Sequence, residues 1–132
     1  MPREKINIIN KREVDVFTIE YRSDGLLHLH AKGDEIKMAH YKAVVKSIGE
    51  MTGGKKVPVL CTANEFLIPD QDVRKYMTTP ESNPYSLASA LVIHSIAQKL
   101  IANFFVNVMK PARPIRMFTS KEEAVKWLKK FL

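Results

Sequence analysis

Residues 14–32 read VDVFTIEYRSDGLLHLHAK, and this stretch decides the fold. Its first part, residues 14–22, is rich in β-branched and aromatic side chains, which favour β-strands. The SDG that follows is a turn signal, because glycine adopts positive φ without strain. Apolar and polar side chains then alternate, so that Leu27, Leu29 and Ala31 share one face. The stretch therefore predicts an antiparallel hairpin with one buried face.

The residues after the hairpin alternate between helical and strand patterns. Apolar side chains at helical spacing predict a helix over residues 35–51, with Asp34 as its N-cap and two glycines at its end. Residues 57–62 (VPVLCT) and 87–94 (LASALVIH) are short, nearly continuous apolar runs, which is typical of strands covered on both faces. Between these two strands Asp70 is predicted to cap a short helix.

The last third of the chain repeats the alternation. Ser95 is predicted to cap a helix over residues 96–109, and residues 115–118 make a final short strand. Ser120 and Glu123 form a capping box, in which each side chain bonds the other residue's free backbone N–H. The order is β-β-α-β-α-β-α-β-α. We therefore predict a single α/β domain over residues 1–132, with a mixed sheet of about five strands and four helices.

The composition of the 132-residue chain excludes several classes of protein. Hydrophobic residues make up 45% and charged residues 27%, which is typical of a globular domain and not of a disordered one. The single cysteine, Cys61, cannot form an internal disulfide. No apolar run is long enough to span a membrane or to act as a secretory signal. We therefore expect a cytoplasmic protein.

The net charge is +7, and most of the excess positive charge lies after residue 95. Such a region attracts nucleic acid, an anionic membrane surface or an acidic partner. A solvated lysine face on the last helices is the simpler interpretation, because no binding face with interleaved aromatic residues accompanies the charge. Nucleic acid is therefore not the expected partner.

Polar residues at the ends of two predicted strands form the candidate site. Thr62, Asn64 and Glu65 follow one strand, and His94 and Ser95 follow the other. Ligands of open α/β sheets bind beyond the carboxyl ends of the strands, which favours these five residues as a ligand-binding or partner-binding site. Ordinary turn and helix-cap chemistry is the alternative, because it uses the same residue types.

Two pairs of side chains have the composition of a reactive site. His28 and His30 project from one strand face, but a protein zinc site needs at least three ligands, which favours surface histidines. Cys61 and His94 end two predicted strands, and a Cys/His pair is the minimal activated nucleophile. A lone cysteine in an apolar strand is more often an inert small hydrophobe. We therefore predict no metal, no cofactor and no catalytic residue.

The C-terminal strand and helix carry a family resemblance. Their residues are Arg116-Met117-Phe118-Thr119-Ser120 and Glu122-Glu123-Ala124-Val125-Lys126-Trp127-Leu128. With the element order, they resemble the STAS domain, the SpoIIAA-like fold of bacterial anti-sigma-factor antagonists, and above all the small bacterial STAS/SEC14-like proteins. The antagonists carry an Asp-Ser phosphorylation motif. Residues 61–66 (CTANEF) hold no such pair, and Thr62 is the only hydroxyl nearby.

The resemblance implies two functions. The first is a non-enzymatic regulatory module that acts through protein–protein contact, as a homodimer. The second, implied by the SEC14-like relatives, is a domain that binds a small apolar ligand or lipid. A wide apolar helix surface favours the second, and it is made of Phe104, Phe105, Val106, Val108 and Met109. An enzyme that uses Cys61 or His94 is the third alternative.

Overall fold

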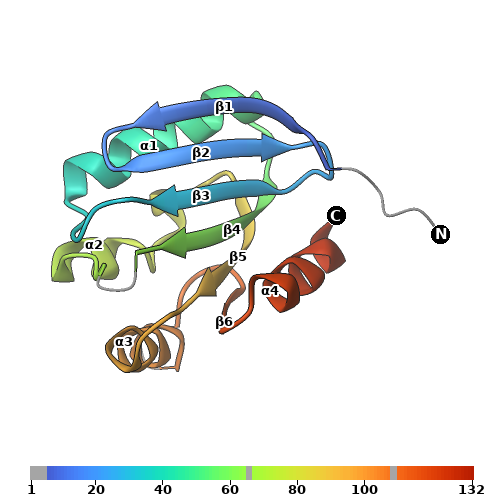
Figure 1. Cartoon of the computed structure of the whole chain (residues 1–132). Coiled ribbons are helices and arrows are strands. Elements are labelled where there is room, and N and C mark those ends of the chain that lie inside the picture. Colours follow the sequence, from blue (N-terminus) through green and yellow to red (C-terminus); the bar gives the residue numbers. More distant parts are fainter. Residues whose placement is uncertain (1–5, 65–66, 108–109) are drawn as a thin grey trace.

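The computed structural model describes residues 6–64, 67–107 and 110–132. Within them lies a six-stranded sheet whose strands follow one another in chain order, from β1 at one edge to β6 at the other (Figure 1). The pairs β1–β2 and β2–β3 are antiparallel, and the remaining pairs are parallel. The strands are β1 (Ile8–Val14), β2 (Phe17–Arg22), β3 (Leu27–Ala31), β4 (Val57–Ala63), β5 (Ser86–Val92) and β6 (Ile115–Phe118).

Four α-helices connect or follow the strands, as the sequence predicts. They are α1 (Met38–Thr52), α2 (Gln71–Tyr76), α3 (Ile96–Asn107) and α4 (Lys121–Leu128), and two 3₁₀ turns, η1 (Pro80–Ser82) and η2 (Lys129–Phe131), complete the order. The predicted α/β class and mixed sheet are therefore confirmed. No helix within the described ranges is both long and apolar enough to cross a membrane.

The sheet has one strand more than the sequence predicts. The expected first strand, residues 14–22, is divided by a turn in which Asp15 has a φ of 54°. The chain before this turn forms β1, which pairs with β2 and lies at the edge of the sheet. Most side chains of an edge strand can face solvent, and residues 8–11 are all exposed. The strand therefore lacks the apolar alternation that marks a half-buried strand in sequence.

Helix α1 begins later than predicted. Its N-cap is Lys37, not Asp34, and its first residue is Met38. The backbone of the segment before it pairs with a distant loop: the carbonyl of Asp34 accepts from the Ile68 N–H at 3.4 Å. Residues 34–36 are therefore held outside the helix, in the connection between β3 and α1. The helix ends as predicted, because Gly53 adopts the left-handed conformation with a φ of 64°.

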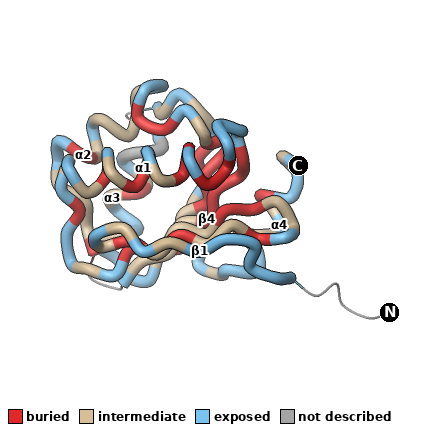
Figure 2. Tube along the Cα trace, turned by 90° about the horizontal axis from the view of Figure 1, so that it is seen from above, coloured by how far each residue is buried: buried red, intermediate tan, exposed pale blue. Residues whose placement is uncertain are grey.

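Helices cover both faces of the sheet. On one face α1 packs over a core that includes Leu27, with Leu29 packed against it and Ala31 inside it, so the predicted apolar face of β3 is confirmed. On the opposite face α4 covers a smaller core around Leu60 and Leu128. Viewed from above, α1, α2 and α3 lie on the same side of the strands, and buried residues concentrate between them and the sheet (Figure 2).

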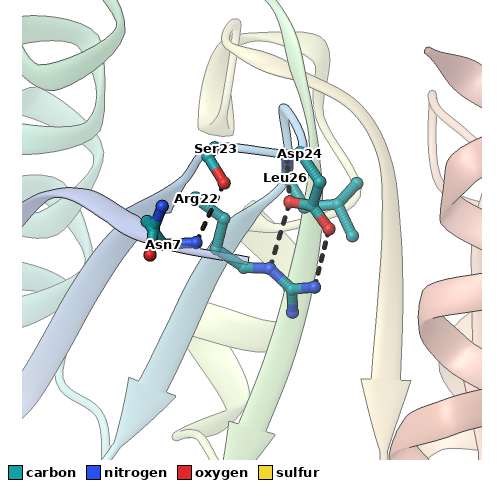
Figure 3. Close-up of polar contacts among 5 residues, drawn as sticks. All are labelled: Asn7, Arg22, Ser23, Asp24 and Leu26. Carbon is teal, nitrogen blue, oxygen red and sulfur yellow. Dashed lines mark hydrogen bonds and ion pairs between the residues drawn. The ribbon is translucent and has the colours of Figure 1, made fainter. Parts of the chain in front are cut away.

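The turn between β2 and β3 contains a buried ion pair. The Nε and Nη2 atoms of Arg22 donate to the two carboxylate oxygens of Asp24 at 3.1 and 2.7 Å, and both side chains are under 10% exposed. The same carboxylate accepts a bond from the Leu26 N–H at 3.3 Å. Beside it, Ser23 exchanges bonds with the backbone of Asn7, which ties the start of β1 to the turn (Figure 3).

The two predicted serine caps are present. Ser95 Oγ accepts from the Gln98 N–H at 3.1 Å, and Ser120 Oγ accepts from the Glu123 N–H at 3.4 Å. The reciprocal bond of the predicted capping box, from the Ser120 N–H to the Glu123 side chain, is not among the bonds of the described residues. Helix α4 therefore starts where the sequence predicts, with one of the two hydrogen bonds of the expected capping box.

Candidate functional site

An apolar cavity of about 160 Å³ lies on the α1 face of the sheet, where β3, β4 and β5 end. The strands contribute Leu29, Ala31, Cys61, Ala63 and Leu91, and the helices contribute Tyr41, Arg74, Gln98, Ile101 and Ala102. An engineered cavity of about 150 Å³ lined by aliphatic and aromatic side chains stays dry and binds benzene. The cavity therefore has the size and the lining to hold one small apolar molecule.

Small side chains create the space. Ala31 and Ala63 end two neighbouring strands on the cavity side, and Ala102 faces them from α3. A larger side chain at any of these positions would project into the cavity. The position agrees with the general rule that α/β sheets bind ligands beyond the carboxyl ends of their strands.

Gln98 closes one side of the cavity and joins three segments. Its Nε2 donates to the carbonyl oxygens of Asn64 and Leu67 at 2.9 and 3.0 Å, and its Oε1 accepts from the His94 N–H at 2.9 Å. Its own N–H bonds Ser95. The structure thus brings Asn64, His94 and Ser95 together around a residue that sequence reasoning missed. In the sequence, the only indication of a role for Gln98 is its position three residues after the helix cap, Ser95.

The predicted site residues do not all face the cavity. Thr62 lies at its border, but its hydroxyl bonds His28 and His30 on the opposite face of the sheet. His94 and Ser95 line a separate hollow with Lys99 and Thr119. The side-chain amide of Asn64 donates to the carbonyl of Lys32, so it joins the end of β4 to the segment that follows β3. Glu65 lies outside the described residues.

The Cys61 thiol has the wrong protonation state for a nucleophile. Burial raises the pKa of Cys61 to about 12, although Arg113 acts in the opposite direction. The thiolate is the reactive form of cysteine, and this shift disfavours it near neutral pH. His94 belongs to the other hollow. Cys61 and His94 thus line different hollows of the described structure.

His28 and His30 are not the solvated surface histidines that the sequence suggested. Strand β3 pairs with β4 so that His30 is opposite Thr62, and both imidazoles reach the Thr62 hydroxyl. The distances are 2.7 Å from His28 Nε2 and 2.8 Å from His30 Nδ1. The hydroxyl has one proton, so it donates to one ring and accepts from the other. Glu20 lies 3.7 Å from the other nitrogen of His28.

This cluster keeps His28 neutral. Burial, assisted by the positive charge of Lys121, by His30 and by Arg22, lowers the pKa of His28 from 6.5 to about 4. A neutral ring is the form that can accept the Thr62 proton. No group of three or more metal-ligating side chains occurs among the described residues, so the two histidines lack the further ligands that a zinc site requires.

The lowered pKa of His28 predicts a loss of stability in mild acid. Between pH 6.5 and 4 the unfolded chain binds a proton at His28 that the folded protein excludes, so the free energy of unfolding falls as pH falls through this window. We expect the free energy of unfolding to fall by about 2 kcal/mol across this window. A fully desolvated ring would give a larger change, but the His28 ring is partly solvated. Urea titrations at several pH values measure it.

His28→Gln should remove most of this pH dependence. His94→Gln, which replaces a histidine outside the cluster, is the matched control and should retain it. An unchanged pH dependence in His28→Gln would contradict the assignment.

Comparisons with known proteins identify relatives but no activity. The model of one family, described as "Domain of unknown function (DUF7793)", matches residues 19–132. No curated protein matches the chain. A crystal structure of a protein with unknown function from Arthrobacter sp. FB24 is similar at 23% identity and a TM-score of 0.29, and the match covers 83% of this chain and 96% of that one.

Proposed function

This chain belongs to the DUF7793 family, whose description names no activity, and we propose from its geometry that it is a non-enzymatic domain that binds a small apolar molecule. The observation that carries the proposal is the cavity of about 160 Å³ at the ends of β3, β4 and β5. Binding pockets are mostly apolar with a few placed polar groups, and this cavity has that character. The STAS/SEC14-like resemblance agrees with such a role.

The cavity differs from the ligand surface that the sequence suggested. Ile101 and Ala102 of α3 line it, whereas Phe104 is 56% exposed. Val108 and Met109 lie outside the described residues, as do the side chains of Phe105 and Val106. The ligand is therefore expected to bind between α3 and the sheet, not on the outer surface of the helix.

Filling the cavity should abolish binding. Native mass spectrometry of the purified protein tests for a small molecule that is lost on denaturation, and toluene titrated into the ¹⁵N-labelled protein tests the cavity directly. We expect toluene to shift amide signals near Ala31, Ala63 and Ala102. Ala102→Leu should raise the dissociation constant for toluene at least about tenfold, because the added side chain occupies the space.

Ala97→Leu is the matched control, since it makes the same change at an exposed position of the same helix. It should bind toluene like the unmodified protein. If neither a co-purified molecule nor toluene binds, the proposed function is wrong.

A protein-interaction role is the second candidate, and the outer face of α3 favours it. Ile96, Leu100 and Phe104 recur every four residues and are 78%, 65% and 56% exposed. Monomeric proteins rarely expose a contiguous apolar patch of this kind, and a self-complementary patch on a second copy would cover it. Under this proposal the chain forms a homodimer through α3.

Sedimentation velocity tests the homodimer. Leu100→Glu should raise the dimer dissociation constant at least about tenfold, because it places a charge inside an apolar contact. Lys99→Glu changes an exposed neighbour outside the stripe and should have a much smaller effect. A protein that stays monomeric at the highest soluble concentration would refute the homodimer.

A further inference from the structure

Few side chains of the cavity lining could bind a polar group of a ligand. The lining is mostly aliphatic and aromatic, and its polar side chains are Tyr41, Cys61, Thr62, Arg74 and Gln98. A polar ligand group that enters an apolar cavity needs a hydrogen-bond partner there, because an unpaired polar group costs free energy. The bonds that these five side chains already make therefore limit the polar groups that the cavity can accept.

Four of the five polar side chains offer no strong donor to a ligand. The side-chain amide of Gln98 donates to two backbone carbonyls and accepts from a backbone N–H. The Thr62 hydroxyl bonds two histidines on the opposite face of the sheet. The Tyr41 hydroxyl has hydrogen-bond partners in two side chains outside the lining, and the Cys61 thiol is only a weak donor. Arg74 remains.

The guanidinium of Arg74 lies at the wall of the cavity. Arg74 is half-buried in α2 and is the single charged side chain among the described residues of the lining. Its side chain folds back to the segment before the helix, where Nη1 donates to the Pro69 carbonyl at 2.6 Å. Pro69 also lines the cavity. This bond therefore fixes the charged end of Arg74 beside a residue of the cavity wall.

The other two nitrogens of this guanidinium have the geometry that binds a carboxylate. Nε and Nη2 of Arg74 make no hydrogen bond to a described residue, and none of the five ion pairs in that part of the chain includes Arg74. Their N–H bonds are parallel and match the two oxygens of a carboxylate. Arg22 uses the same two nitrogens to hold Asp24, at 3.1 and 2.7 Å.

We infer that the ligand is a small monocarboxylic acid, whose apolar part fills the cavity and whose carboxylate pairs with Nε and Nη2 of Arg74. This inference rests on the proposed ligand-binding function and specifies its ligand class. The cavity volume, close to that of a cavity that holds benzene, limits the apolar part to one aromatic ring or a short branched chain. A single cation in the described lining favours a singly charged group over a phosphate.

Calorimetric titrations of the full chain with benzoate and with benzamide, its neutral analogue of the same shape, test the inference. We expect benzoate to bind about tenfold more tightly at low salt, because hydrogen bonds between charged groups are strong but the half-buried Arg74 is partly screened by water. Raising the salt concentration to about 0.5 M should reduce this preference, and it should change benzamide binding little.

Three variants assign the preference to one side chain. Arg74→Met should remove the preference for benzoate while benzamide binding stays unchanged. Arg74→Lys keeps the charge but loses the parallel N–H pair, so it should retain only part of the preference. Lys75→Met is the matched control, because it removes an exposed cation of the same helix that is not part of the lining. It should bind both compounds like the unmodified protein.

The outcomes separate the inference from the function on which it rests. If toluene and benzamide bind but benzoate binds no more tightly, or if Arg74→Met keeps the preference, the carboxylate assignment is overturned and the cavity remains a ligand site. If toluene, benzamide and benzoate all fail to bind, the proposed function itself fails. Benzamide binding by Arg74→Met reports that this variant is folded, and Arg74→Lys gives a second test if it is not.

Discussion

Asp24→Ala should lower the free energy of unfolding by about 3–5 kcal/mol, the largest effect expected for a single substitution in the β2–β3 turn. The substitution leaves Arg22 buried, with a side chain only 9% exposed, and removes both of its charged bonds. It also removes the acceptor for the Leu26 N–H. The total free energy of unfolding of a domain of this size is small, so the urea concentration at the midpoint of unfolding should fall markedly.

Two variants test the cause of this loss. Arg22→Met combined with Asp24→Ala removes the buried charge together with its partner, and should recover part of the stability. Glu13→Ala removes an exposed ion pair with Lys32, at 3.3 Å, and should cost less than about 1 kcal/mol. If Asp24→Ala is no more destabilising than Glu13→Ala, the ion pair does not hold the turn.

Gly49→Ala should destabilise the protein by about 2–3 kcal/mol, although alanine is the better helix former by about 1 kcal/mol. A Cβ on Gly49 would lie 2.5 Å from two ring carbons of Tyr85 and 2.8 Å from its hydroxyl oxygen. The ring packs against the larger core, so it cannot move without disturbing that packing. Chemical denaturation measures the change.

Gly33→Ala is the control for this prediction. Its Cβ would meet Val16 at 3.4 Å, an ordinary contact, so we expect a change within about 0.5 kcal/mol. Tyr85→Leu combined with Gly49→Ala should recover part of the loss by removing the ring. If Gly49→Ala is as stable as the unmodified protein, the close contact between helix α1 and the Tyr85 ring does not require glycine at position 49.

The sequence predicted those parts of the fold that local interactions determine. The apolar face of β3, the serine caps of α3 and α4 and the stop at Gly53 were all read from neighbouring residues, and all are present. The start of α1 was wrong because the backbone before it bonds a loop more than thirty residues away. The extra strand β1 was missed because an edge strand needs no apolar pattern of its own.

The cavity lies at the edge of the sheet where the sequence placed the candidate site, but its lining differs from the five predicted residues. The carboxyl ends of β4 and β5 were the expected region, and the cavity lies there. Ala102 and Gln98 help to shape the cavity, but they belong to no recognisable sequence motif. The neighbouring sequence does not show whether an alanine or a glutamine of a helix faces a cavity or solvent. Likewise His28 and His30 looked solvated until the pairing of β3 with β4 placed Thr62 between them.

By itself, then, the sequence determined the class, the approximate order of elements and most helix ends, because side-chain periodicity and capping act within a few residues. Only the tertiary structure decided the strand register, the cavity and the bonds of His28 and His30 to Thr62. These features depend on which distant segments come together, since an interior surface exists only after the helices and strands that form its walls have packed.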